Sequence, residues 1–347
     1  MNQNPMKQAA LLMLFIVVIV MGTWEFYLRH TGLTPSYDDS PALWADKRAQ
    51  VYEPSDKAIV FIGSSRIKFD LDIPTFEQMT GKHAIQLGAV GSSPRKFLEN
   101  LADDPNFKGK LVVDVTELFF FSDNPFISEV PMESLASYNK RTPAERASFE
   151  LNRFLESQLV FLDKNQLSTN AKLEQLQIPS RPGIFMLPNF PIEFSCTDFN
   201  GQLKMSPRFL TDTTLQNQVK NIWKFLFGGP PPPPITEEQL TATFKEIKSQ
   251  TDKIKARGGE VVFTRTPSNG WLLEKEKKIF PRVQFWDRLL KETGCKCFHY
   301  EDYPETAGLI CPELSHLTPE NAILYTKALV NILAKETNFA FQNFQTK

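Results

Sequence analysis

The chain has 347 residues, of which 41% are hydrophobic and 23% are charged, and this is enough for one large domain or two small ones. Its 39 Lys and Arg residues nearly balance its 40 Asp and Glu residues, so the formal net charge is −1. Nucleic-acid binding depends on many positive charges that neutralise phosphates, and we therefore expect no nucleic acid as a partner.

The N-terminus carries an apolar segment. Residues 8–24 contain no charged side chain and are almost wholly hydrophobic. Together with Trp24, Phe26 and Tyr27, which suit an interfacial aromatic belt, the segment approaches the roughly 20 residues that a membrane-spanning helix needs. No small-residue cleavage site follows it. We therefore predict an uncleaved signal anchor that contacts the membrane over residues 8–28, in preference to a cleaved signal peptide or a short buried core helix.

The orientation follows from the short tail before this segment. Lys7 precedes the span, and Arg29 and His30 follow it, so the charge difference between its two ends is small. A short N-terminal tail before a long domain usually stays inside the cell. We expect residues 1–30 to form a cytoplasmic tail and anchor, with the remaining chain outside the cytoplasm, on the periplasmic or cell-surface side.

The four cysteines give little indication of a cross-link or a metal site. Their even number is compatible with an oxidising compartment. Cys295 and Cys297 are too close for an easy mutual bridge in an extended segment, and a bridge from one of them to Cys311 remains open. The cysteine spacings, including that of Cys196, offer too few convergent ligands for zinc, so we predict neither a metal nor a cofactor.

Beyond a polar linker at residues 31–56, which holds a short helix near 42–51, strands and helices alternate. Continuous apolar runs that end near glycine are typical of buried parallel strands. The strands are expected at 58–62, 84–87, 111–115, 260–264 and 297–300, and the main helices at 94–103, 237–257, 275–293 and 319–335. Such alternation predicts βαβ units and a parallel sheet.

The alternation breaks at residues 119–235. This stretch holds helical segments near 143–158 and 213–227, and it ends in a polyproline spacer at 230–234, which we interpret as a stiff connector. We therefore predict an α/β domain over residues 57–347. It is expected to be a three-layer sandwich around a mainly parallel five-stranded sheet, with 119–235 as a large insertion after the third strand.

The candidate chemistry lies at the carboxyl ends of the strands, where parallel sheets bind ligands. Ser65 follows the first strand in a turn at a helix start, and His316 lies in a polar turn before the last helix. A serine hydroxyl needs an adjacent histidine base that is oriented by a carboxylate, and Glu313 lies three residues before His316. We predict Ser65 as the nucleophile, His316 as its base and Glu313 as the group that orients His316.

These segments resemble the SGNH, or GDSL-like, hydrolase superfamily over most of residues 57–337. Gly63-Ser64-Ser65 is similar to the Gly-Asp-Ser block, and Glu313-x-x-His316 to the Asp-x-x-His block. The resemblance implies that the backbone N–H groups of Ser65 and Gly91 hold the oxyanion. Thr116 stands where the family has asparagine, so the resemblance assigns its hydroxyl as a third, weaker donor.

The anchor and the variant blocks are similar to the envelope branch of this superfamily. Its members act beside membrane-bound O-acyltransferases in exopolysaccharide acetylation and in D-alanylation of teichoic acid. The resemblance implies O-acyl transfer or ester hydrolysis on a polysaccharide, with a membrane-bound O-acyltransferase as partner. The alternative is a catalytically weak scaffold that binds glycan or such an acyltransferase. Arg66 and Arg265 are secondary candidates for holding an anionic substrate group, and structural salt bridges are the competing interpretation for both.

Overall fold

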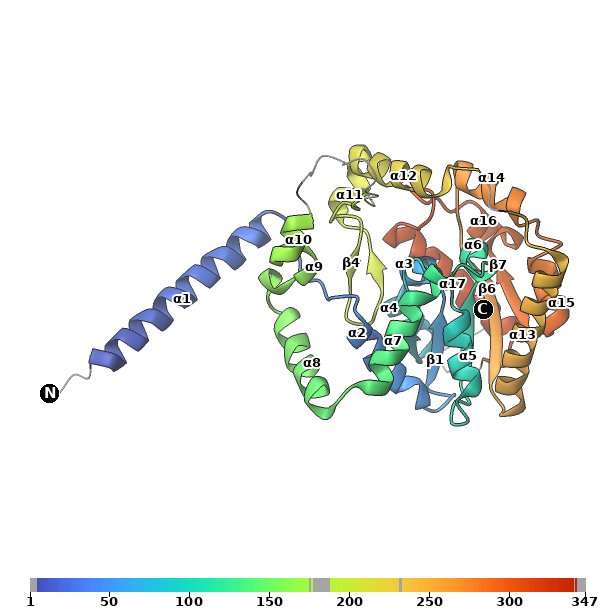
Figure 1. Cartoon of the computed structure of the whole chain (residues 1–347), viewed down its shortest axis with the longest axis horizontal. Helices are drawn as coiled ribbons and strands as arrows, with labels where there is room; N and C mark the ends of the chain where they lie inside the picture. The colour runs from blue at the N-terminus through green and yellow to red at the C-terminus, as the bar shows by residue number, and fades with distance from the viewer. Residues whose placement is uncertain (1–4, 175, 177–187, 231–232, 340, 342–347) are drawn as a thin grey trace. The chain divides into compact units, whose positions relative to one another are not determined.

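A computed structural model of the chain describes residues 5–174, 176, 188–230, 233–339 and 341 (Figure 1). The chain divides into two compact units: residues 1–38 with 142–189, and residues 39–141 with 190–347. The predicted insertion is therefore shared between the two units, because its residues 142–189 group with the N-terminal helix. Part of the expected polyproline spacer, residues 231–232, lies outside the described residues.

The smaller unit contains the N-terminal helix α1 (Pro5–His30). This helix is the one described helix that is long and apolar enough to cross a membrane. Its apolar side chains are exposed as far as Tyr27, whereas Leu28 is buried. Its 26 residues correspond to a length of about 39 Å. The unit also contains α8 (Pro143–Glu156), η3 (Val160–Leu162), α9 (Lys164–Leu167) and α10 (Thr169–Glu174).

The larger unit is built on a five-stranded sheet whose paired strands are all parallel, in the order β2-β1-β3-β6-β7. The strands are β1 (Ala58–Ile62), β2 (His83–Gln86), β3 (Lys110–Asp114), β6 (Glu260–Arg265) and β7 (Lys296–His299). Five strands are thus confirmed near their predicted positions, and the parallel arrangement is confirmed as well. A separate two-stranded antiparallel pair, β4 (Cys196–Thr197) with β5 (Leu203–Lys204), was not expected.

The helices of the larger unit include several that the apolar periodicity predicted. In chain order they are α2 (Pro41–Ala49), η1 (Gln50–Tyr52), α3 (Ser65–Asp70), α4 (Ile73–Thr80), α5 (Arg95–Asp103), α6 (Glu117–Phe120), η2 (Pro125–Ser128), α7 (Glu129–Lys140), α11 (Pro207–Thr211), α12 (Thr213–Phe227), α13 (Glu237–Ala256), α14 (Gly270–Ile279), α15 (Trp286–Thr293), η4 (Tyr300–Asp302), α16 (Pro304–Ala307) and α17 (Pro319–Glu336). The single helix expected at 275–293 is wrong, because α14 ends before Pro281, whose missing N–H cannot continue a helix.

Successive side chains along the strands pack alternately into two separate hydrophobic cores. Val60 and Val113 point into the core that contains residues of α5, α13 and α15. Phe61 and Val112 point into the other core, which contains residues of α3, α4 and α17. Burying such near-continuous apolar strands on both faces is typical of parallel sheets. The expected linker also contributes, since Trp44 of α2 packs into the first core and donates to the Leu87 carbonyl at 3.0 Å.

The two cores also separate the cysteines. Cys295 and Cys297 pack against one core, whereas Cys311 belongs to the other, so the sheet lies between them. All four cysteines, which fall within the described residues, are free thiols. The bridge from Cys311 to Cys295 or Cys297 that the sequence left open is therefore not formed.

Candidate active site

The turn after β1 presents Ser65. A side chain at Gly63 would place its Cβ 2.6 Å from Cβ of Asp114, so only glycine fits where β1 passes into α3. Ser64 then caps the helix, accepting from the Arg66 N–H at 3.3 Å. Every residue from Ala58 to Ile73 is buried except Ser65, which is partly exposed. The turn thus brings one hydroxyl to the surface at the carboxyl edge of the sheet.

The loop before α17 brings His316 to that hydroxyl. Its Nε2 atom lies 2.9 Å from Ser65 Oγ, across 251 residues of sequence. Its Nδ1 atom lies 3.0 Å from Oε1 of Glu313. Glu313 is 0% exposed and His316 is 1% exposed. When Nδ1 carries the ring proton and donates it to Glu313, Nε2 can accept the serine proton, which is the arrangement that activates a serine.

The same loop is held by its own backbone. Oε1 of Glu313 accepts the N–H groups of Ser315 at 3.2 Å and His316 at 2.6 Å. Oδ1 of Asp70, from α3, accepts the Leu317 N–H at 2.8 Å, which ties this loop to the helix that begins with Ser65. Leu314 is the one non-glycine residue with a positive φ in the described chain, at 86°. Such backbone strain is often found where a functional loop is held in one shape.

Trp223 of α12 completes the surroundings of Glu313. Its indole N–H donates to Oε2, the carboxylate oxygen that does not face the histidine. The His316 ring lies against Phe69, with centroids 4.5 Å apart, and near Phe194 at 5.6 Å and Trp223 at 6.0 Å. This aromatic wall, defined here as Phe69, Phe194 and Trp223, limits water around His316 and Glu313. The sequence reading missed Trp223 because the apolar pattern of its helix resembles that of an ordinary core helix.

Behind Ser65 lies a buried polar layer. The Ser64 and Thr116 hydroxyls are 2.7 Å apart, and Thr116 donates to Asp114 at 3.3 Å. The Thr116 hydroxyl, expected as an oxyanion donor, is therefore buried and engaged with internal partners. Burial raises the pKa of Asp114 to about 6. Burial also raises the pKa of Asp70 well above its usual value, and the nearby carboxyl of Asp114 adds to this increase.

The predicted backbone donors of the oxyanion lie at open positions. Ser65 is the first residue of α3, where helix N–H groups have no intrahelical partner. Gly91, in the loop after β2, is exposed and has a φ of 63°, and the position of a Cβ there would be open space. Since β2 pairs with β1 in parallel, this loop leaves the sheet at the same edge as Ser65.

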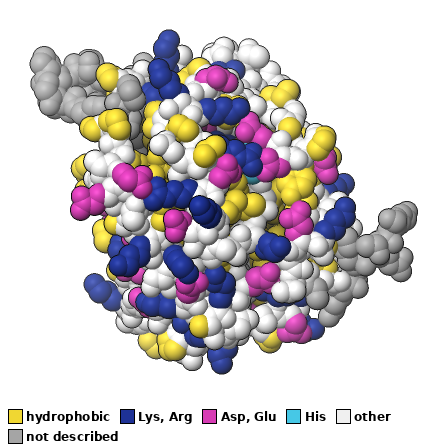
Figure 2. All heavy atoms as spheres, turned by 90° about the vertical axis from the view of Figure 1, so that its right-hand side faces the viewer, with side chains coloured by type: hydrophobic (Ala, Val, Ile, Leu, Met, Phe, Trp, Pro, Cys, Tyr) yellow, Lys and Arg dark blue, Asp and Glu magenta, His cyan; other side chains and the backbone are white. Residues whose placement is uncertain are grey.

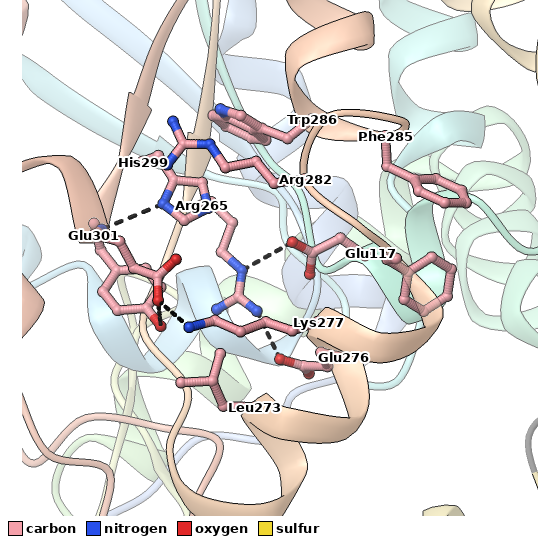
Figure 3. Close-up of a pocket in the computed structure, with 12 residues that line it drawn as sticks. Glu117, Arg265, Leu273, Glu276, Lys277, Arg282, Phe285, Trp286, His299 and Glu301 are labelled. Atoms are coloured by element: carbon pink, nitrogen blue, oxygen red, sulfur yellow. Dashed lines mark hydrogen bonds and ion pairs between the residues drawn. The ribbon is translucent and has the colours of Figure 1, made fainter.

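Arg66 and Arg265, the secondary substrate-binding candidates, are both buried in one ion-pair network. Glu276 accepts from both guanidinium groups, at 2.6 Å from Nη2 of Arg265, and Arg265 also donates to Glu117 at 3.0 Å (Figure 3). Burial raises the pKa of Glu276, but the charges of the two arginines outweigh it and lower that pKa to about 2. Arg66 also donates to Ser315 at 3.3 Å, beside His316. The charges of both arginines are thus satisfied within the protein.

A cavity of about 270 Å³ borders this network at the ends of β6 and β7. Figure 3 shows Arg265 reaching between Glu117 and Glu276, with Trp286, Phe285 and His299 around them.

On the face shown in Figure 2, basic and acidic side chains are interspersed, apart from the residues drawn in grey. Within the described residues, no three His, Cys, Asp or Glu side chains converge as a metal site would need.

No protein-family model matches the chain, and no curated protein matches it in sequence. The chemistry proposed below therefore rests on the arrangement of its side chains.

Proposed function

We propose that this chain is a membrane-anchored enzyme that transfers or hydrolyses an acyl ester through an acyl-enzyme on Ser65. The observation that carries the proposal is the continuous contact from Ser65 Oγ to His316 Nε2 at 2.9 Å and from His316 Nδ1 to Glu313 Oε1 at 3.0 Å. A serine, a buried histidine and a buried carboxylate in this order form the constellation that acyl transfer requires.

The steps follow from this geometry. His316 Nε2 takes the hydroxyl proton as Ser65 Oγ bonds to the ester carbonyl carbon, and Glu313 stabilises the resulting imidazolium. The N–H groups of Ser65 and Gly91 hold the oxyanion. The intermediate then releases the alcohol, which receives its proton from His316. A second hydroxyl or water, deprotonated by His316, attacks the acyl-enzyme and regenerates the Ser65 hydroxyl.

We further propose that the chain is an SGNH-like protein of the envelope type. The blocks Gly63-Ser64-Ser65 and Glu313-x-x-His316 support this, as does the parallel sheet that brings them together. The two cores on opposite sheet faces support a three-layer sandwich. Residues 119–235 lie between β3 and β6, which are neighbours in the sheet, and this supports an insertion after the third strand. In this proposal α1 spans the membrane, the larger unit lies outside the cytoplasm, and a membrane-bound O-acyltransferase and a polysaccharide are the partner and substrate.

The catalytically weak scaffold is the second candidate, and the engagement of Thr116 favours it. The Thr116 hydroxyl contacts Ser64 and Asp114, so the oxyanion would rely on backbone donors alone. The scaffold would bind glycan or the acyltransferase without forming an acyl-enzyme.

The test is hydrolysis of p-nitrophenyl acetate and p-nitrophenyl hexanoate by the full chain in detergent. The proposal predicts turnover that Ser65→Ala reduces to the uncatalysed rate, whereas Ser64→Ala, in the same turn, retains part of it. Absence of turnover with both esters, in a protein that unfolds cooperatively, would support the scaffold instead.

A further inference from the structure

We propose that α8 is a membrane-surface helix whose exposed apolar side chains lie at the boundary between the lipid headgroups and the acyl chains, beside the anchor. The proposal rests on the proposed membrane span of α1 and is independent of the chemistry at Ser65. Both helices belong to the smaller compact unit.

The first observation is an apolar face on α8 without a protein partner in the described chain. Leu151, Phe154 and Leu155 are 62%, 64% and 36% exposed, and their spacing of three and four residues places them on one side of the helix. Phe149, on the opposite side, is partly buried. An exposed cluster of large apolar side chains marks an interaction site rather than an ordinary surface.

The polar positions of α8 complete an amphipathic pattern. Glu150 and Arg153, away from this apolar face, form an ion pair at 3.1 Å. The helix begins with a capping box, in which Thr142 and Glu145 satisfy each other's backbone N–H groups, so its start does not need lipid to be stable. Interfacial membrane helices have this pattern, with the apolar face toward the lipid and the charged face toward water.

The second observation fixes where α8 lies along the anchor. Glu25 of α1 accepts the N–H groups of Val160 at 3.0 Å and Phe161 at 3.1 Å, and Arg29 donates to the Gln158 carbonyl at 2.8 Å. Gln158 follows the last residue of α8 by only two positions. The C-terminal end of α8 is therefore tied to the last turns of α1.

That level of α1 is where a bilayer interface falls. Glu25 is the first charged residue after the uncharged run 8–24, and Trp24 stacks on Tyr27 as an aromatic pair at the end of that run. In Figure 1, α8 runs across the direction of α1 rather than along it. A helix held at this level and in this direction lies along the membrane surface, with Leu151, Phe154 and Leu155 available to lipid.

The test uses the full chain reconstituted in phosphatidylcholine vesicles, with and without lipids brominated near the top of the acyl chains. Three variants, each with one residue substituted by tryptophan, are compared with the wild-type protein, whose five tryptophans give the background fluorescence. Phe154→Trp reports on the apolar face of α8. Asn152→Trp, exposed on another side of the same helix, is its matched control, and Phe15→Trp reports on the centre of α1.

The proposal predicts that the fluorescence added by Phe154→Trp is blue-shifted, and that bromine near the top of the acyl chains quenches it at least twofold. The fluorescence added by Asn152→Trp should be quenched little. Equal, weak quenching at both α8 positions would overturn it. Phe15→Trp separates this failure from failure of the anchor. If bromine placed deep in the bilayer quenches position 15 while position 154 stays unquenched, the span is retained and the surface helix is rejected. If neither position is quenched, the span itself is wrong.

Discussion

The indole N–H of Trp223 donates to the oxygen of Glu313 that faces away from His316, so both oxygens of this buried carboxylate have partners. Ninety residues separate the two side chains in sequence. Through this contact α12 helps to hold Glu313 in place against His316.

Trp223→Phe keeps the aromatic ring and removes the N–H donor. Hydrogen bonds to charged groups contribute about 1.5–3 kcal/mol, and part of this energy holds Glu313 against His316. We therefore expect kcat for p-nitrophenyl acetate to fall at least about tenfold, with little change in KM. A double-mutant cycle with Glu313→Ala checks the reason. Positioning predicts that Trp223→Phe has little further effect in that background, whereas a purely structural role predicts additive losses.

Asp114 predicts a pH dependence of stability. Its pKa is raised by burial to about 6 in the folded protein, from 3.8 in the unfolded chain. Since the folded state binds this proton more tightly, the stabilisation is complete below about pH 4 and is lost as the pH rises through 6. Asp114→Asn carries no charge at any pH. We expect its unfolding free energy, relative to the wild type, to increase between pH 4 and 7 by about 2 kcal/mol.

Urea denaturation of the two proteins in detergent, at several pH values, measures this difference. A difference between them that does not vary with pH would show that Asp114 does not titrate in this window.

The backbone conformation of Leu314 predicts that its glycine and alanine variants differ in stability. Its φ of 86° suits glycine, whereas any residue with a Cβ is strained there. Leu314→Gly and Leu314→Ala remove nearly the same side chain, so comparing them isolates the backbone. We expect the glycine variant to be more stable to urea than the alanine variant by about 1 kcal/mol. Alanine equal to or more stable than glycine would mean that the loop is not strained.

Replacement of Glu276 is expected to lower the free energy of unfolding by a large amount. Its removal leaves the buried guanidinium groups of Arg66 and Arg265 without their shared partner, and breaking a buried pair in this way costs about 3–5 kcal/mol. Glu276→Ala should therefore unfold at much lower urea concentration. Lys277→Ala, the neighbouring residue in a half-exposed pair with Glu301, should change the unfolding free energy by less than about 1 kcal/mol. Similar losses for both variants would argue against a stabilising network.

The sequence located the parallel strands and the segments that meet at their carboxyl ends because both depend on local patterns. Ser65 follows an apolar run that ends in glycine, and His316 precedes a capped helix, so a parallel sheet brings them to one edge. Trp223 could not be predicted in the same way. It lies in a segment without strand and helix alternation, and its partner Glu313 is set by how that segment folds over the sheet.

The ion pairs of the two buried arginines could not be predicted from local sequence patterns either. Arg66 follows β1 and Arg265 is the last residue of β6, so both lie on the expected edge, as anion-binding residues would. Their burial depends on Glu276, which is 210 residues from Arg66 and lies on a helix whose start the sequence misplaced. A charge that is paired across such a distance leaves no local signature. The engagement of Thr116 with Ser64, across 52 residues, is likewise a tertiary contact.

The most direct test of the proposed chemistry is to trap the acyl-enzyme. The full chain in detergent is mixed with p-nitrophenyl acetate, quenched in acid within seconds, and analysed by intact and peptide mass spectrometry. We predict one acetyl group on the peptide that contains Ser65, absent in Ser65→Ala and strongly reduced in a His316→Ala variant. An unmodified Ser65 peptide together with no ester turnover, or the same acetylation in Ser65→Ala, would contradict the account.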